Sequence, residues 1–130
     1  NTGSPHYVQW VNQPLPLEEI QEKGFGIRHL PQYEKEGINV NFVAPLTENS
    51  IWVGTFERGV EAPTYSCGTG VTAAALAYAS KTKSQAENNR IFIQVPGGNL
   101  IVQWKWINGK ITDLMLIGPA TRVFDGIWKG

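Results

Sequence analysis

The chain has 130 residues with eleven basic and eleven acidic side chains, so its formal net charge at pH 7 is zero, which excludes a broad basic surface for nucleic acid or an acidic membrane. Its single cysteine excludes an internal disulfide and is typical of a reducing compartment, and its longest apolar run, residues 73–79, is too short to span a bilayer. A chain of this length can bury a core without disulfides or metals, and we expect residues 1–130 to form one domain.

The first half of the chain predicts three strands and one helix. Residues 6–11 alternate apolar and polar side chains, which is typical of a strand. Residues 17–23 carry two glutamates in their first turn, so they predict a short helix that Gly24 ends. Residues 38–43 and 51–57 predict two further strands that are joined by a short loop and pair with each other.

An alanine-rich helix is predicted directly after Cys67. Residues 71–79 are apolar almost all round, which indicates a central, buried helix, and the polar residues 81–90 lead from it into solvent. The remaining residues predict only strands and turns, with Asn108-Gly109 as the strongest hairpin signal. The expected strands there are 91–95, 99–107, 110–117 and 120–124. The elements together predict an α+β fold in which a curved, mostly antiparallel sheet wraps around one central helix.

Cys67 is the first candidate for chemistry, because it lies in Ser66-Cys67-Gly68-Thr69-Gly70 at the mouth of that helix. The unpaired N–H groups and the dipole of a helix N-terminus favour a thiolate over a thiol. The two glycines allow another molecule to approach the backbone closely, and a carboxylate suits such a helix start. The alternative is an inert cysteine that serves as a small apolar side chain.

Other polar residues lie at strand ends and on strand faces. Arg58 can clamp a carboxylate through two parallel hydrogen bonds, and Glu57 can help to take a proton from the thiol; the alternative is a solvated ion pair between them. His6 is either a general base or a partly buried histidine with ordinary partners. Asn39 and Asn41 share one strand face and predict either a ligand contact or a structural bridge.

Other kinds of site have weaker signals. No histidine or cysteine pair has the spacing of metal ligands, so no metal site is expected. Gly68-Thr69-Gly70 lacks the lysine and the spacing of a phosphate-binding P-loop. Trp104 and Trp106 share one face of a strand, where aromatic side chains more often form core than a stacking platform for bases.

Taken together, these segments resemble the diaminopimelate epimerase family. The matching motifs, in order, are Gly3-Ser4-Pro5-His6, Asn39-Val40-Asn41-Phe42, Glu57-Arg58-Gly59, Ser66-Cys67-Gly68-Thr69-Gly70 and Gly118-Pro119-Ala120. The resemblance covers essentially the whole chain, but only the C-terminal half of the family's chain, in which two similar lobes each contribute one cysteine. The Cys-Gly-Asn-Gly motif of the family's first lobe is not in this sequence.

The resemblance implies a cytoplasmic enzyme of lysine and cell-wall precursor synthesis that inverts the α-carbon of diaminopimelate, an amino acid, without pyridoxal phosphate or another cofactor. It implies that Cys67 is one of two acid/base groups and that the N-terminal lobe of the same enzyme supplies the other. It implies that Glu57 and His6 assist the movement of protons. The residues that it implies for substrate binding are Asn39, Arg58, Gly68, Thr69 and Ser4, the last of which stands where the family usually has asparagine.

The resemblance also sets expectations for the chain by itself. With one cysteine, the chain alone is expected not to epimerise its substrate, and its open face around Cys67 is expected to self-associate, for example as a homodimer. Pro63 departs from the family pattern and stiffens the loop ahead of the cysteine. Two alternatives stay open: a related isomerase of the same fold, such as a proline racemase, and a non-catalytic lobe that binds amino-acid carboxylates.

Overall fold

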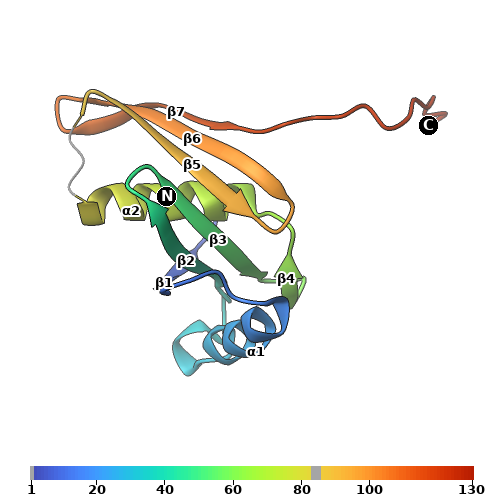
Figure 1. Ribbon diagram of the computed structural model, residues 1–130. Helices are drawn as coiled ribbons and strands as arrows, with labels where there is room; N and C mark the ends of the chain where they lie inside the picture. The colour runs from blue at the N-terminus through green and yellow to red at the C-terminus, as the bar shows by residue number, and fades with distance from the viewer. Residues whose placement is uncertain (1, 83–85) are drawn as a thin grey trace.

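One twisted sheet carries the fold in residues 2–82 and 86–130, which the computed structural model describes (Figure 1). Its strands follow the order β1-β2-β3-β5-β6-β7, and β4 pairs with β3. The β1–β2 and β3–β5 pairs are parallel and the other pairs are antiparallel. The bounds are β1 His6–Trp10, β2 Asn39–Thr47, β3 Ser50–Glu57, β4 Ala62–Thr64, β5 Asn88–Val95, β6 Gly98–Ile107 and β7 Lys110–Ile117. The expected α+β fold with a curved, mostly antiparallel sheet is confirmed.

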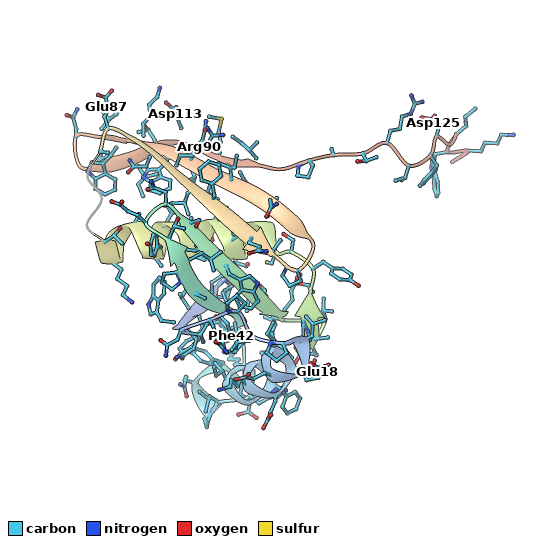
Figure 2. All side chains as sticks on the ribbon, viewed as in Figure 1. Glu18, Phe42, Glu87, Arg90, Asp113 and Asp125 are labelled. Carbon is cyan, nitrogen blue, oxygen red and sulfur yellow. The ribbon has the colours of Figure 1, made fainter. Side chains whose placement is uncertain are left out.

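Two helices, α1 (Leu17–Arg28) and α2 (Gly68–Thr82), pack against the sheet in two separate cores. A short 3-10 helix, η1 (Pro31–Tyr33), follows α1. Successive strand residues point to opposite faces. Val40 and Phe42 of β2 therefore join the core around α1, whereas Val43 joins the core around α2. Phe42, which Figure 2 labels, is fully buried. The alternation within β2 thus separates the two cores.

Helix α1 is longer than the sequence predicts. The expected stop at Gly24 is wrong, since the helix continues to Arg28. A Cβ added at Gly24 would lie 2.4 Å from the Cβ of Phe56 on β3. Glycine at this position therefore lets the helix approach the sheet closely, and it does not end the helix.

Helix α2 begins directly after Cys67, as expected, and one of its sides is less enclosed than the others. Ala74 and Ala75 are fully buried against the sheet, whereas Ala73 and Leu76 are only partly buried. The expectation of a central, buried helix is confirmed, with one side of the helix left partly exposed. The partly exposed side of α2 lies next to the polar residues described below.

The predicted strands in the last third of the chain are confirmed as β5, β6 and β7, with two corrections. First, β5 begins at Asn88, inside the segment expected to lead into solvent; residues 83–85 of that segment lie outside the described residues. Second, the strand expected over 120–124 is wrong. Residues 118–130 have no regular secondary structure and extend away from the sheet (Figure 1), with Asp125 near their end (Figure 2). No strand of the described structure pairs with this segment, and Phe124 and Trp128 are 82% and 92% exposed.

The short strand β4 was not expected from the sequence. It includes Pro63, which lies opposite Phe56 in the pair with β3. Residues 50–52 of β3 pair with β5, and residues 55–57 pair with β4. Proline is tolerated in such a short edge strand because its missing N–H is not needed there. Strand β4 leads the chain from the end of β3 toward Cys67.

Candidate active site

Five polar side chains of the sheet occupy alternate positions on the face toward α2. His6 lies opposite Asn39 in the β1–β2 pair, and Asn41 lies opposite Thr55 in the β2–β3 pair. Strand residues of the same alternation pack in the core around α2. Glu57 comes two residues after Thr55, so it shares this face. The register therefore brings residues from three strands to one face of the sheet.

Cys67 lies at the N-terminal end of α2, where its free thiol is partly buried. The backbone N–H of Gly97 donates a 2.9 Å hydrogen bond to the carbonyl of Tyr65, so the turn between β5 and β6 anchors the loop ahead of the cysteine. A Cβ added at Gly70 would lie 3.3 Å from Cys67 Sγ, which places the sulfur against the first turn of the helix. The positive end of the helix dipole favours an anion at this position.

Three of the residues implied by the resemblance meet beside this sulfur. Thr69 Oγ1 lies 3.6 Å from Cys67 Sγ and 2.9 Å from His6 Nε2. Ser4 Oγ lies 3.2 Å from Thr69 Oγ1 and 3.1 Å from His6 Nε2. The strand β1 and the first turn of α2, which lie far apart in the sequence, therefore contribute to one polar cluster around the thiol.

Asn39 bridges three segments. Its Oδ1 accepts a 2.9 Å hydrogen bond from the backbone N–H of Arg58, and its Nδ2 donates to Ser4 Oγ at 3.2 Å and to the carbonyl of Pro5 at 3.1 Å. The side chain is almost fully buried. The sequence left open a ligand contact or a structural bridge for Asn39, and these hydrogen bonds favour the structural bridge, which holds Ser4 in the cluster.

Asn41 makes a second bridge, which reaches a residue that the sequence analysis missed. Its Nδ2 lies 3.1 Å from His6 Nδ1 and donates to the carbonyl of Tyr7 at 3.2 Å. Its Oδ1 accepts a 3.0 Å hydrogen bond from Thr55 Oγ1. Thr55 could have been found only from the register of β2 against β3, since it lies directly across from Asn41.

Glu57 is the last residue of β3, and Arg58 follows it. The sequence left open an ion pair between them, but no salt bridge of the described residues joins these two side chains. The Arg58 guanidinium donates a 2.6 Å hydrogen bond to the carbonyl of Glu36. Its side chain lies over Gly37, where an added Cβ would be 2.6 Å from Arg58 Cδ. Arg58 therefore contributes its backbone N–H to the bridge of Asn39, while its side chain contacts the loop ahead of β2.

The pKa of His6 lies below its ordinary value of 6.5. Burial is the main cause, because it disfavours the charged imidazolium, and the positive charge of Arg58 adds to the effect. The negative charge of Glu57 opposes both. The neutral form of His6 is therefore favoured in the cluster, and it is the form that can accept or pass on a proton near neutral pH.

An open groove of about 580 Å³ borders the cluster, lined by Thr2, Gly3, Ser4, Pro5, His6, Glu36, Ala73 and Leu76. Ser4 and His6 contribute polar groups to its wall, and the partly exposed side of α2 contributes the apolar part. A second hollow, of about 520 Å³, is lined mainly by apolar residues such as Phe92, Leu100 and Ile117. It contains none of the polar cluster, so the first groove is the better candidate for a ligand of the site.

Other classes of site find little support in the part of the chain that the structure describes. No group of three histidine, cysteine, aspartate or glutamate side chains there is arranged to hold a metal ion. Neither α1 nor α2 has the length and apolar composition that a membrane-crossing helix requires.

Comparison with known proteins supports an epimerase family. The sequence model described as diaminopimelate epimerase matches residues 1–123. A diaminopimelate epimerase of Flavobacterium psychrophilum is 41% identical over 125 residues, which cover 96% of this chain and 48% of that protein. One of Methanothrix thermoacetophila is 54% identical over 128 residues, which cover 98% of this chain and 41% of that protein. The chain therefore spans about half the length of the curated relatives it matches.

The fold also occurs in solved structures of low sequence identity. A probable proline racemase of Agrobacterium radiobacter, crystallised with carbonate, superposes with a TM-score of 0.59 at 12% identity, covering 88% of this chain and 38% of that one. At this identity the likeness concerns the fold alone.

Proposed function

The chain belongs to the diaminopimelate epimerase family, and we propose that it forms the C-terminal half of an enzyme that interconverts LL- and meso-diaminopimelate without pyridoxal phosphate or another cofactor. Such an enzyme belongs to lysine and cell-wall precursor synthesis, and we place it in the cytoplasm. The observation that carries the proposal is the thiol of Cys67 at the N-terminus of α2, 3.6 Å from Thr69 Oγ1 and beside the His6 cluster.

In the proposed reaction, two groups act on opposite faces of the α-carbon. Cys67 as a thiolate takes the α-proton and becomes a thiol, or, in the reverse direction, gives its proton to the carbanion and becomes a thiolate. A second thiol, from the N-terminal lobe, does the opposite on the other face, so the net reaction changes only the configuration. The negative charge that develops on the substrate needs fixed hydrogen-bond donors, and the N–H groups at Gly68 and Thr69 are suited to supply them.

The remaining residues have supporting parts in this proposal. His6 and Glu57 help to move protons to and from the site, and the lowered pKa of His6 keeps its imidazole neutral near pH 7. Ser4 lines the groove and can contact a substrate amine or carboxylate. Asn39 and Arg58 either contact the substrate or shape the cluster from behind, and the contacts of Asn39 with Ser4 and Arg58 favour the second part.

The chain alone has one of the two thiols, so we propose that it is inactive without the N-terminal lobe. The direct test follows α-proton exchange of LL-diaminopimelate in heavy water by NMR, with the chain alone and with a separately produced N-terminal lobe. The proposal predicts exchange with inversion only in the mixture and none with proline as a control substrate. No exchange in a mixture of two folded lobes, or exchange with proline only, contradicts it.

Self-association of the isolated chain stays a prediction. The groove next to the cluster includes the partly exposed Ala73 and Leu76, which a partner lobe would cover. Sedimentation at increasing concentration is expected to show dimers or larger species. A monomer at every concentration contradicts the expectation.

A further inference from the structure

We infer that Asn41, held by Thr55, decides which ring nitrogen of His6 carries the proton and thereby turns the Thr69 hydroxyl into a hydrogen-bond donor to Cys67. Asn41 is in this sense a positioning residue, because it acts on the thiol through two other side chains. This role of Asn41 rests on the proposed function of Cys67 as a proton-transfer group, but the hydrogen-bond directions follow from the contacts of the described residues alone.

The orientation of the Asn41 amide is fixed by a group that can only accept. Its Nδ2 lies 3.2 Å from the carbonyl oxygen of Tyr7, which has no proton to donate. On the other side, Oδ1 accepts from Thr55 Oγ1 at 3.0 Å. Asn41 is fully buried and Thr55 is almost fully buried, so water does not offer alternative partners. The amide nitrogen therefore faces His6.

This orientation selects one tautomer of His6. The nitrogen that faces the ring, Asn41 Nδ2, only donates, and it lies 3.1 Å from His6 Nδ1. His6 Nδ1 must therefore accept, and it carries no proton. In the neutral ring the proton is then on Nε2, which lies 2.9 Å from Thr69 Oγ1 and 3.1 Å from Ser4 Oγ. His6 is thus a donor toward both hydroxyl groups.

A second fixed amide determines the proton of Ser4. Asn39 Oδ1 accepts from the backbone N–H of Arg58, and Asn39 Nδ2 faces the carbonyl of Pro5, so its orientation is fixed on both sides. The same Nδ2 donates to Ser4 Oγ at 3.2 Å. Because the imidazole N–H is also a donor, the remaining acceptor for the Ser4 hydroxyl proton in the cluster is Thr69 Oγ1, at 3.2 Å.

The Thr69 hydroxyl is left with one direction for its own proton. Its oxygen faces two donors, His6 Nε2 and the Ser4 hydroxyl. The other neighbour that the described structure gives it is Cys67 Sγ, at 3.6 Å. A hydroxyl that donates to sulfur stabilises the thiolate relative to the thiol. The buried amides of β2 thereby favour the form of Cys67 that can take a proton.

Two measurements on this chain test the inference. One is the rate of thiol alkylation, which reports on Cys67 alone because Cys67 is the single cysteine. Nitrogen-15 NMR of the imidazole rings reports the tautomer of His6 in the unsubstituted chain, and we expect the proton on Nε2. The rate of alkylation of Cys67 by iodoacetamide near neutral pH reports the thiolate. Thr69→Val, which removes the hydroxyl, is expected to slow alkylation roughly three- to tenfold, whereas Thr69→Ser, which keeps it, is expected to have little effect.

The substitution Asn41→Asp tests the upstream part of the inference. Its carboxylate accepts at both oxygens, so it holds a proton on His6 Nδ1. In the neutral ring, Nε2 is then an acceptor and takes the Thr69 proton away from the sulfur, and alkylation is compared at a pH at which the nitrogen-15 spectrum shows the neutral ring. Alkylation is expected to slow by the same factor as in Thr69→Val. The double variant is expected to be no slower than either single variant, because both act through one hydroxyl.

Four results overturn the inference. The first two are a proton on His6 Nδ1 in the unsubstituted chain, and Thr69→Val alkylated as fast as the unsubstituted chain. The other two are a folded Asn41→Asp alkylated as fast as the unsubstituted chain, and slowing that multiplies in the double variant, which indicates a direct effect of the new charge. If Asn41→Asp does not fold, the tautomer measurement and the Thr69 variants still decide. A chain that has these properties but no epimerase activity with its partner lobe contradicts the proposed function and leaves the inference standing.

Discussion

Gly70, in the first turn of α2, lies directly against the buried amide of Asn41. A Cβ added at Gly70 would be 2.4 Å from Asn41 Oδ1. The glycine therefore allows the helix that carries Cys67 to approach the strand that carries the two amide bridges. The distance between the thiol and the polar cluster depends on this close approach.

Gly70→Ala is expected to lower the free energy of unfolding by about 1–3 kcal/mol, because neither the buried amide nor the helix backbone can give way without breaking hydrogen bonds. Urea denaturation measures the change. Gly26→Ala in α1 is the matched control, since an added Cβ there meets nothing within 4 Å. That control is expected to be neutral or to stabilise by up to about 1 kcal/mol. Equal effects of the two substitutions contradict the packing account.

Asn39→Ala tests the bridge between β1, β2 and the end of β3. The substitution removes the acceptor of the Arg58 N–H and the donor to Pro5, and leaves both groups without these partners. We expect a loss of about 1–3 kcal/mol in the free energy of unfolding. Asn12→Ala, in an exposed loop, is the control and is expected to change stability by less than about 0.5 kcal/mol. A loss no larger than that of the control contradicts the bridge.

His6 makes the stability of the fold depend on pH. Its pKa is lower in the folded chain than its ordinary value of 6.5, so between these two values the unfolded chain binds more protons than the folded one. The contribution of His6 is therefore fully present above pH 6.5 and is lost as the pH falls through the pKa of the folded state. His6→Gln is expected to flatten the fall of the unfolding free energy in this window.

A substitution that removes no titratable group supplies the control for this pH dependence. Asn12→Ala, in the exposed loop after β1, is expected to keep the slope of the unsubstituted chain. Unfolding free energies from urea titrations at a series of pH values below 6.5 measure the slopes. If His6→Gln leaves the slope as steep as Asn12→Ala does, burial of His6 is not the cause.

The sequence alone could predict the features that depend on local pattern. The alternation in 38–43 and the turn ahead of 51–57 indicated the two central strands, and the helix after Cys67 followed from its alanine-rich run. The same alternation put Asn39 and Asn41 on one face. What these amides contact could not be predicted, because Thr55 and Ser4 reach them only through strand register and through the fold of the N-terminal segment.

The wrong predictions of secondary structure share one cause: tertiary packing, and not the local sequence, decides these elements. Gly24 has the chemistry of a helix stop, but it serves a close approach to Phe56. Residues 120–124 follow a Gly-Pro turn, as a further strand would, but no strand of the described structure pairs with them. The three-residue strand β4, which contains Pro63, is too short for any pattern to indicate.

The central claim is that Cys67 is one of two groups that transfer protons on opposite faces of the substrate. The most direct measurement uses the reconstituted two-lobe enzyme with Cys67→Ala, incubated in heavy water with LL- or meso-diaminopimelate, and follows deuterium at the α-carbon and configuration separately. With one group removed, the other can exchange the α-proton of one isomer with retention but cannot invert it. We therefore predict exchange of one isomer only, without interconversion. Continued interconversion of the two isomers by the Cys67→Ala enzyme would contradict the claim.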